Sequence, residues 1–134
     1  MAVKVNGDKY EENNLIGTEE IEVIKGGTIN DTIQGGLGAD TITGGTGANL
    51  IEYSKGDGND VINLTKGENF TLSLLDIDNI NKIKFEFVKN DLRIYTDSTK
   101  TTSEDEYITI KNFVSKDVTN NGNAKKGIDD TSSV

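Results

Sequence analysis

Between Gly35 and Glu52 a nine-residue unit occurs twice in direct succession. Residues 35–43 read GGLGADTIT, and residues 44–52 read GGTGANLIE. A fixed internal period constrains the fold more than local preferences do, because each unit of a repeat protein buries its apolar face only against neighbouring units. We therefore expect a stack of similar coils rather than one irregular core.

The same frame extends in both directions from this pair, with Tyr53 and Ser54 inserted before its last unit. We number the units repeats 1 to 6, and they span residues 8–16, 17–25, 26–34, 35–43, 44–52 and 55–63. Position 6 of the unit is acidic or an amide: Asn13, Glu22, Asp31, Asp40, Asn49 and Asp60. Position 8 is a branched aliphatic residue: Leu15, Ile24, Ile33, Ile42, Ile51 and Ile62. The match is close over 26–63 and loose before it.

The two halves of the unit predict different local structures. The Gly-Gly-x-Gly stretch tolerates positive φ and close backbone approach, as a tight turn requires. The following x-Ile-x stretch predicts a short strand whose central side chain points to one face and whose neighbours point to the other. Two such units make a coil of two strands and two turns, so stacked coils should form two facing sheets, each with an aliphatic ladder.

Stacked turns bring the position-6 side chains of alternate repeats together. Strands in a sheet lie about 4.8 Å apart, a spacing at which carboxylates repel each other. A calcium ion binds oxygen at about 2.3 to 2.6 Å, so two oxygens on opposite sides of it lie at about the layer spacing. Glycine-rich turns also leave backbone carbonyls uncovered, and calcium needs six or more oxygen ligands. The pattern therefore favours a calcium site at the turns.

These residues resemble the RTX repeat, the calcium-binding nonapeptide of secreted bacterial toxins, proteases, lipases and adhesins. The resemblance implies an all-β fold: a right-handed parallel β-roll in which each calcium lies between turns two repeats apart. The alternative is a metal-free β-solenoid whose glycines and aspartates are ordinary turn residues. For repeats 1 and 2 we expect a capping coil without metal.

The resemblance also implies three sets of calcium ligands. The first set joins Gly35, Leu37 and Asp40 to Gly56, Gly58 and Asp60. The second joins Gly26, Thr28 and Asp31 to Gly45, Gly47 and Asn49. The third joins Glu22 to Gly36, Gly38 and Asp40. The chain departs from the family pattern at Asn49, which carries no charge, and at Glu22, which is longer than aspartate.

Charge and composition agree with a cation as the partner. The net charge is -9, and residues 1–63 hold 4 lysines against 11 acids. This balance argues against nucleic acid as a partner. The chain has 0 Cys and 0 His, which excludes disulfides and histidine-based catalysis, and we expect no enzyme activity. No segment has the length of a membrane span, and the first residues lack the apolar stretch of a signal peptide. We expect the chain to be part of a larger protein.

After Asn63 the period changes to the alternation typical of longer strands. Apolar residues alternate over 70–74, 83–87, 92–95 and 107–113, with a predicted turn at 89–91 and a loop at 96–106. We interpret residues 64–114 as an antiparallel β cap on a roll of residues 8–63. Residues 115–134 are polar and are expected to form a disordered tail, which resembles an uncleaved type I secretion signal as readily as an idle end.

The expected function is calcium-coupled folding that supports type I secretion of a larger protein, with calcium and the secretion machinery as partners. Glycine loses more backbone entropy on folding than other residues, so the repeats should need calcium to fold, and extracellular calcium would supply it. The alternative is a polysaccharide-binding or adhesin module, in which basic residues of the cap meet an acidic glycan: Lys82, Lys84, Lys89, Arg93 and Lys111.

Overall fold

The computed structural model describes residues 3–64, 69–76, 80–96, 106–113 and 132–133. Most of the expected loop at 96–106 and of the expected tail at 115–134 lies outside these residues. Within them the fold is built from strands and one short 3₁₀ turn, η1 (Ile80–Lys82). The described residues include no helix with the length and hydropathy of a membrane span.

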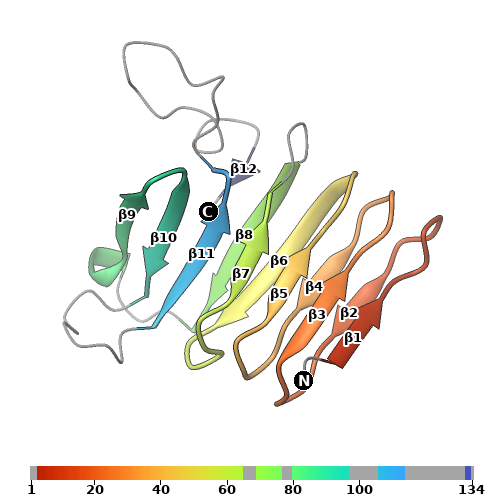
Figure 1. Ribbon diagram of the computed structural model, residues 1–134, viewed down its shortest axis with the longest axis horizontal. Helices are drawn as coiled ribbons and strands as arrows, with labels where there is room; N and C mark the ends of the chain where they lie inside the picture. The colour runs from red at the N-terminus through yellow and green to blue at the C-terminus, as the bar shows by residue number, and fades with distance from the viewer. Residues whose placement is uncertain (1–2, 65–68, 77–79, 97–105, 114–131, 134) are drawn as a thin grey trace, which may run out of the picture.

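Two sheets face each other along the length of the molecule (Figure 1). The first sheet has the order β1-β3-β5-β7-β11-β10-β9, and the second has the order β12-β8-β6-β4-β2. The strands are β1 (Val3–Asn6), β2 (Asn14–Ile16), β3 (Glu22–Lys25), β4 (Thr32–Gln34), β5 (Thr41–Thr43), β6 (Ala48–Ser54), β7 (Val61–Asn63), β8 (Asn69–Leu75), β9 (Lys84–Val88), β10 (Asp91–Tyr95), β11 (Tyr107–Lys111) and β12 (Ser132–Ser133). Successive repeats alternate between the sheets, and all repeat strands pair in parallel, which confirms the predicted β-roll.

The position-8 residues form one ladder in each sheet. In the first sheet Ile24 pairs with Ile42, and Ile42 pairs with Ile62. In the second sheet Ile33 pairs with Leu15 on one side and with Ile51 on the other. Strands β4, β5 and β7 each show the alternation of half-buried and buried residues that a short strand facing a core requires.

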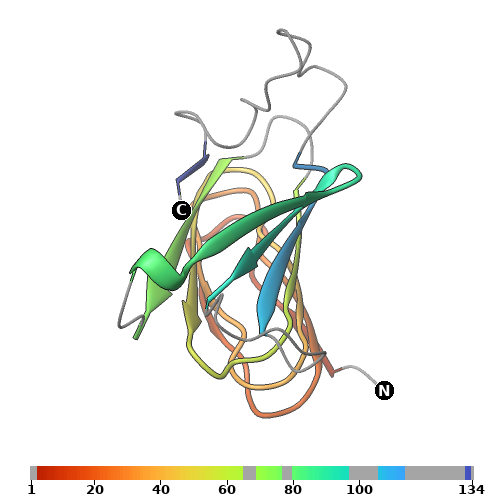
Figure 2. The same ribbon diagram turned by 90° about the vertical axis from the view of Figure 1, so that its left-hand side faces the viewer.

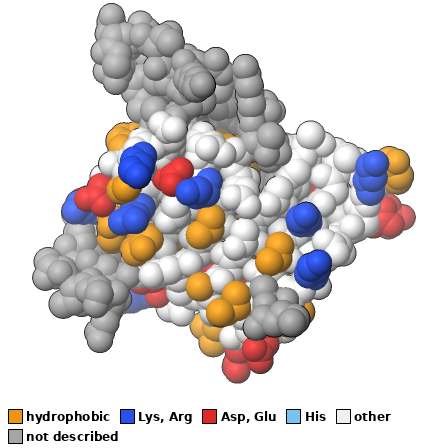
Figure 3. All heavy atoms as spheres, in the orientation of Figure 1, with side chains coloured by type: hydrophobic (Ala, Val, Ile, Leu, Met, Phe, Trp, Pro, Cys, Tyr) orange, Lys and Arg blue, Asp and Glu red, His pale blue; other side chains and the backbone are white. Residues whose placement is uncertain are grey.

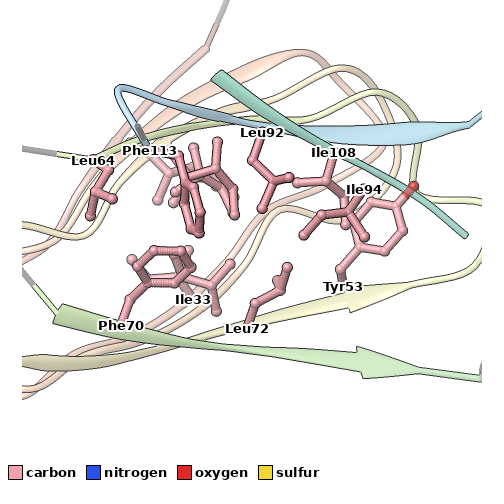
Figure 4. Close-up of a cluster of buried hydrophobic side chains, with 14 residues drawn as sticks. Ile33, Tyr53, Leu64, Phe70, Leu72, Leu92, Ile94, Ile108 and Phe113 are labelled. Atoms are coloured by element: carbon pink, nitrogen blue, oxygen red, sulfur yellow. The ribbon is translucent and has the colours of Figure 1, made fainter. Parts of the chain in front are cut away.

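The core lies between the sheets and becomes bulkier towards the C-terminal end. There Phe70 and Leu72 of β8 point towards Leu92, Ile108 and Phe113 from the opposite sheet (Figure 4). Full burial of a large aliphatic or aromatic side chain contributes about 1.5 to 3 kcal/mol. The ladder and this aromatic end therefore form one continuous apolar core.

The C-terminal end of the roll carries an antiparallel element, as expected for the cap. β9 pairs antiparallel with β10, and β10 pairs antiparallel with β11. β11 itself pairs in parallel with β7, so this element continues the first sheet. Figure 2 shows β9, β10 and β11 in front of the flattened coils of the roll.

Parallel stacking also includes strands on both sides of the predicted 8–63 segment. β1 lies before that segment and pairs with β3, while β8 lies after it and pairs with β6 over seven residue pairs. The alternation of Phe70, Leu72 and Leu74 predicted a strand here, but alternation is the same in parallel and antiparallel strands. Of the expected polar tail, Ser132 and Ser133 pair with β8.

Candidate metal centre

The turns of the repeats stack along two edges of the roll, because successive strands alternate between the sheets (Figure 1). We call the first six residues of each repeat its turn. The even edge holds turn 2 (17–22), turn 4 (35–40) and turn 6 (55–60). The odd edge holds turn 1 (8–13), turn 3 (26–31) and turn 5 (44–49). All three predicted ligand sets therefore join turns that are stacked neighbours on one edge.

Turns 4, 5 and 6 share a conformation that turns 2 and 3 lack. Glycines at positions 2 and 4 have positive φ: Gly36 83°, Gly38 96°, Gly45 83°, Gly47 96°, Gly56 97° and Gly58 114°. L side chains rarely adopt this region, which explains the glycines. In turn 3, position 4 is Ile29, and in turn 2 it is Glu20, so these turns take another shape.

The same glycines let neighbouring turns approach through bare backbone. A Cβ atom built on Gly36 would lie 2.5 Å from the carbonyl oxygen of Thr18, and one on Gly58 would lie 2.6 Å from that of Gly38. Real Cβ atoms do not come this close to backbone oxygens. The edges are therefore lined with uncovered carbonyls, the ligand type that calcium takes from protein backbone.

The position-6 side chains form a hydrogen-bonded ladder along each edge. On the even edge the backbone amide of Glu22 donates to Oδ1 of Asp40 (2.8 Å), and that of Asp40 donates to Oδ1 of Asp60 (2.9 Å). On the odd edge Asn13 donates in the same way to Asp31, and Asp31 donates to Asn49 (both 2.8 Å). Glu22, Asp31, Asp40, Asn49 and Asp60 are all buried.

The second carboxylate oxygen of Asp40 has no partner. Asp40 is 1% exposed, and its Oδ2 is the one buried side-chain oxygen or nitrogen of the described residues without a hydrogen bond. Burial and the Glu22 carboxylate raise its pKa to about 6, although the Glu22 amide opposes this shift. Burial and the Asp40 carboxylate raise the pKa of Asp60 to about 8, against the opposing effect of the Asp40 amide.

These observations fit a cation between turns 4 and 6. Two buried carboxylates lie in stacked turns, one with an unsatisfied oxygen, and positive charge nearby would lower both pKa values. Within the described residues no three acidic side chains converge on one point, so backbone carbonyls must supply most ligands here. Turns 4 and 6 contain the six residues of the first predicted set, and calcium accepts such a mixture of oxygens.

The third predicted set lies in turns 2 and 4, where Glu22 already has donors of its own. Its carboxylate accepts from the backbone amide of Thr18 at 2.9 and 3.1 Å and from the Thr18 hydroxyl. Gly36, Gly38 and Asp40 lie in the stacked turn 4. Thr18 was not among the predicted site residues. The sequence signal that could have identified it is the acidic residue at position 6, Glu22, which lies four residues later in the same turn.

The second predicted set lies in turns 3 and 5 on the odd edge, with Asp31 and Asn49 at position 6. Oδ2 of Asp31 accepts from the Gly27 amide (2.8 Å), and Oδ1 accepts from both the backbone and side-chain nitrogens of Asn13 (2.8 Å each). Nδ2 of Asn49 donates to the carbonyl of Gly45 (3.0 Å). Both side chains are therefore supplied with partners.

Two further residues close the even edge at its C-terminal end. Oε1 of Glu106 accepts from the amide of Gly56 (2.9 Å), and Oδ1 of Asn59 accepts from the amide of Tyr107 (3.1 Å). The repeat frame gives no signal for Glu106, which is 50 residues from Gly56 in sequence. β11 thus occupies the place in the first sheet that the strand of a further repeat would take, but it brings no acidic residue to position 6.

The basic residues of the cap are largely engaged within it. Lys111 Nζ lies 2.9 Å from Asp91 Oδ2, Lys84 lies 3.9 Å from Glu86, and the Arg93 guanidinium lies 4.8 Å from the Tyr107 ring centroid. Burial favours a higher pKa for Asp91, but hydrogen bonds from Lys111 and from the Asn112 amide outweigh it and lower the pKa. Acidic side chains are interspersed among the basic ones on this face (Figure 3).

A comparison with protein families identifies the repeats. The family described as RTX calcium-binding nonapeptide repeat matches residues 16–51 in four copies. No curated protein matches the chain with significance. RTX nonapeptide repeats bind Ca²⁺, are structural rather than catalytic modules, and occur typically in secreted bacterial proteins. Residues 16–51 are therefore RTX calcium-binding nonapeptide repeats, and the β-roll that they help to build is a calcium-binding module.

Proposed function

We propose that this chain is a calcium-dependent folding module of a secreted protein, with its principal calcium site between turns 4 and 6. The observation that carries the proposal is the buried, unpartnered Oδ2 of Asp40, in a turn stacked on that of Asp60. A buried carboxylate oxygen without a donor costs free energy comparable to a lost hydrogen bond or more. A fold that retains such an atom in a carbonyl-lined edge is suited to a cation.

The ligands proposed for this site are the carbonyls and carboxylates of turns 4 and 6. Gly35 and Leu37 offer carbonyls, Asp40 offers its carboxylate, and the stacked turn offers Gly56, Gly58 and Asp60. Calcium would supply the positive charge that both buried carboxylates lack. A lower-affinity site is proposed at Glu22, Gly36, Gly38 and Asp40, because binding there competes with the bonds from Thr18 to Glu22.

Folding and binding are coupled in this proposal because the site exists only when the turns are stacked. A ligand that binds the folded state alone stabilises it by RT ln(1 + [L]/Kd), or about 2.7 kcal/mol when calcium is 100 times Kd. Extracellular calcium modules have Kd values of roughly 10⁻⁴ to 10⁻³ M. The module would stay unfolded in the low calcium of the cytosol and would fold after export.

Circular dichroism during a calcium titration tests the proposal. We expect the β-sheet signal to be weak in a calcium-free buffer and to develop cooperatively at millimolar calcium, while equal magnesium has little effect because it prefers a compact octahedral shell. An equal β-sheet signal in chelator and in calcium would refute the proposal. We do not extend it to polysaccharide, since Lys84, Arg93 and Lys111 already have partners in the cap.

A further inference from the structure

The two edges of the roll differ in the hydrogen-bonding groups that their position-6 side chains carry. On the even edge position 6 is always an acid: Glu22, Asp40 and Asp60. On the odd edge an acid lies between two amides: Asn13, Asp31 and Asn49. An amide carries its own N–H donors, whereas a carboxylate carries none. Asp40 and Asn49 occupy the same position in adjacent repeats and differ in whether the side chain can donate a hydrogen bond.

Turns 4 and 5 have the same backbone conformation. Gly36 and Gly45 both have φ of 83°, and Gly38 and Gly47 both have φ of 96°. In turn 5 the Gly45 carbonyl faces the position-6 side chain and accepts from Nδ2 of Asn49 (3.0 Å). The matching carbonyl in turn 4 belongs to Gly36, and position 6 of that turn is Asp40, whose carboxylate has nothing to donate. The N–H group of Asn49 thus occupies in turn 5 the position that a cation would occupy beside Asp40 in turn 4.

The orientation of the Asn49 amide is fixed by its other contact. The backbone amide of Asp31 donates to the opposite end of the group (2.8 Å), and this end must be the oxygen because a backbone N–H cannot accept. Nδ2 therefore points at the Gly45 carbonyl and lies 3.4 Å from that of Thr46. Asn13 repeats the arrangement, with Nδ2 donating to the carbonyls of Asp8 (2.9 Å) and Glu11 (3.0 Å).

Direct hydrogen bonds also join the turns of the odd edge to one another. The Thr46 hydroxyl donates to the Thr28 carbonyl (3.1 Å), and the Ala48 amide donates to Oδ1 of Asn30 (2.7 Å). In turn 4, positions 3 and 5 are Leu37 and Ala39, whose side chains have no polar group with which to make such links. At positions 3 and 5 the odd edge therefore has side-chain hydrogen bonds between turns that Leu37 and Ala39 cannot make on the even edge.

We propose that calcium binds this roll on the even edge only, and that the amides of Asn13 and Asn49 replace it on the odd edge. This inference rests on the proposed calcium-dependent function and refines it. The set Gly26, Thr28, Asp31, Gly45, Gly47 and Asn49 then holds its two turns together without metal, since Asp31 and the Gly45 carbonyl already have N–H donors. A turn of this shape therefore needs a cation when position 6 is a carboxylate, as in Asp40, and needs none when position 6 is an amide with its own N–H donors, as in Asn49.

A pair of reciprocal substitutions tests this assignment. Asn49→Asp removes the N–H donor that faces Gly45 and should add one calcium to the number bound per chain, counted by native mass spectrometry and calorimetry. Asp40→Asn supplies a donor to turn 4 and should lower the number of bound calcium ions while retaining more β-sheet signal in chelator than the wild type does. An Asn49→Asp chain with an unchanged count, or an Asp40→Asn chain with a fully retained count, would overturn the inference.

A second readout locates the ion in the wild-type chain. In the calcium-loaded protein, partial replacement by a paramagnetic lanthanide should broaden the amide signals of residues 36–40 and 56–60 and leave those of residues 27–31 and 45–49 sharp. Equal broadening at both edges contradicts the one-edge assignment while leaving calcium binding intact. A wild-type chain that binds no calcium in calorimetry contradicts the proposed function instead, so the two failures are distinguishable.

Discussion

The backbone amide of Asp40 donates to Oδ1 of Asp60 across 2.9 Å, although the two residues are 20 positions apart in the chain. The bond spans one layer of the roll and holds two acids in neighbouring turns. It satisfies Oδ1 of Asp60, and the Glu22 amide satisfies Oδ1 of Asp40 in the same way, but Oδ2 of Asp40 stays buried without a donor. The centre of the even edge therefore holds an acid with an unsatisfied oxygen.

Replacing Asp60 by alanine should weaken both calcium binding and the fold. The substitution removes one of the two charged ligands proposed for calcium, so we expect the calcium affinity measured by calorimetry to fall about tenfold or more. It also leaves the buried Asp40 amide unpaired, which costs roughly 1 to 3 kcal/mol in urea unfolding at saturating calcium. Glu19→Gln removes an exposed charge from the same edge and should leave both quantities nearly unchanged. Equal effects of the two substitutions would refute this role for Asp60.

Calcium-free protein should be more stable at pH 5 than at pH 8. The folded state raises the pKa of Asp40 from 3.8 to about 6 and that of Asp60 from 3.8 to about 8. Between the unfolded and folded values the folded chain binds more protons, so its stability is greatest at low pH and falls as pH rises through this range. Calcium affinity should rise over the same interval, because binding requires the ionised carboxylates.

The β-sheet circular dichroism signal in calcium-free buffers at pH 5, 6.5 and 8 measures this dependence, because a larger folded fraction gives a stronger signal. The Asp60→Asn variant is the control, since it removes the group with the most strongly raised pKa of the pair and should flatten the curve above pH 6. A wild-type β-sheet signal that rises from pH 5 to pH 8 without calcium would contradict the assignment of these two carboxylates.

The repeat frame predicted the stack and its ladders because the fold repeats every two units. Ile24, Ile42 and Ile62 fall at position 8, and the structure places them in register within one sheet. The direction of β8 and β11 could not be predicted in this way. Side-chain alternation records which face is buried but carries no information about strand orientation.

The candidate metal site could be predicted only in part. Position 6 indicated which side chains line the edges, and Gly38, Gly47 and Gly58 at position 4 mark the turns that adopt positive φ. Which carboxylate oxygens have a hydrogen-bond donor and which have none depends on three-dimensional contacts, so the sequence pattern does not predict it. Thr18 donates to Glu22 within its own turn, and Glu106 reaches Gly56 from a distant strand. No spacing rule in the chain relates Glu106 to the repeats.

Truncating the aliphatic ladder should destabilise the calcium-loaded roll. Ile42 is 1% exposed and pairs with Ile24 on one side and Ile62 on the other. Ile42→Ala removes buried methyl groups between two rigid layers, so we expect a loss of about 2 to 5 kcal/mol in urea unfolding at saturating calcium. Ile21→Ala is the matched control, because Ile21 is 53% exposed and its truncation should cost about 0.5 kcal/mol or less. Similar losses would show that the ladder is not the core.

Alanine at Gly36 and at Gly56 should separate backbone strain from turn stacking. Both glycines have positive φ, 83° and 97°, so alanine at either position should cost about 1 to 2 kcal/mol. A Cβ on Gly36 would also lie 2.5 Å from the Thr18 carbonyl oxygen, whereas one on Gly56 would meet nothing within 4 Å.

We therefore expect Gly36→Ala to reduce the urea midpoint clearly more than Gly56→Ala does, and to raise the calcium concentration needed for folding by a larger factor. The clash is with backbone, which cannot move aside as a flexible side chain would, so turn 4 must separate from turn 2. Equal effects of the two variants would mean that the stacking distance between turns does not limit folding, and that strain at each glycine acts alone.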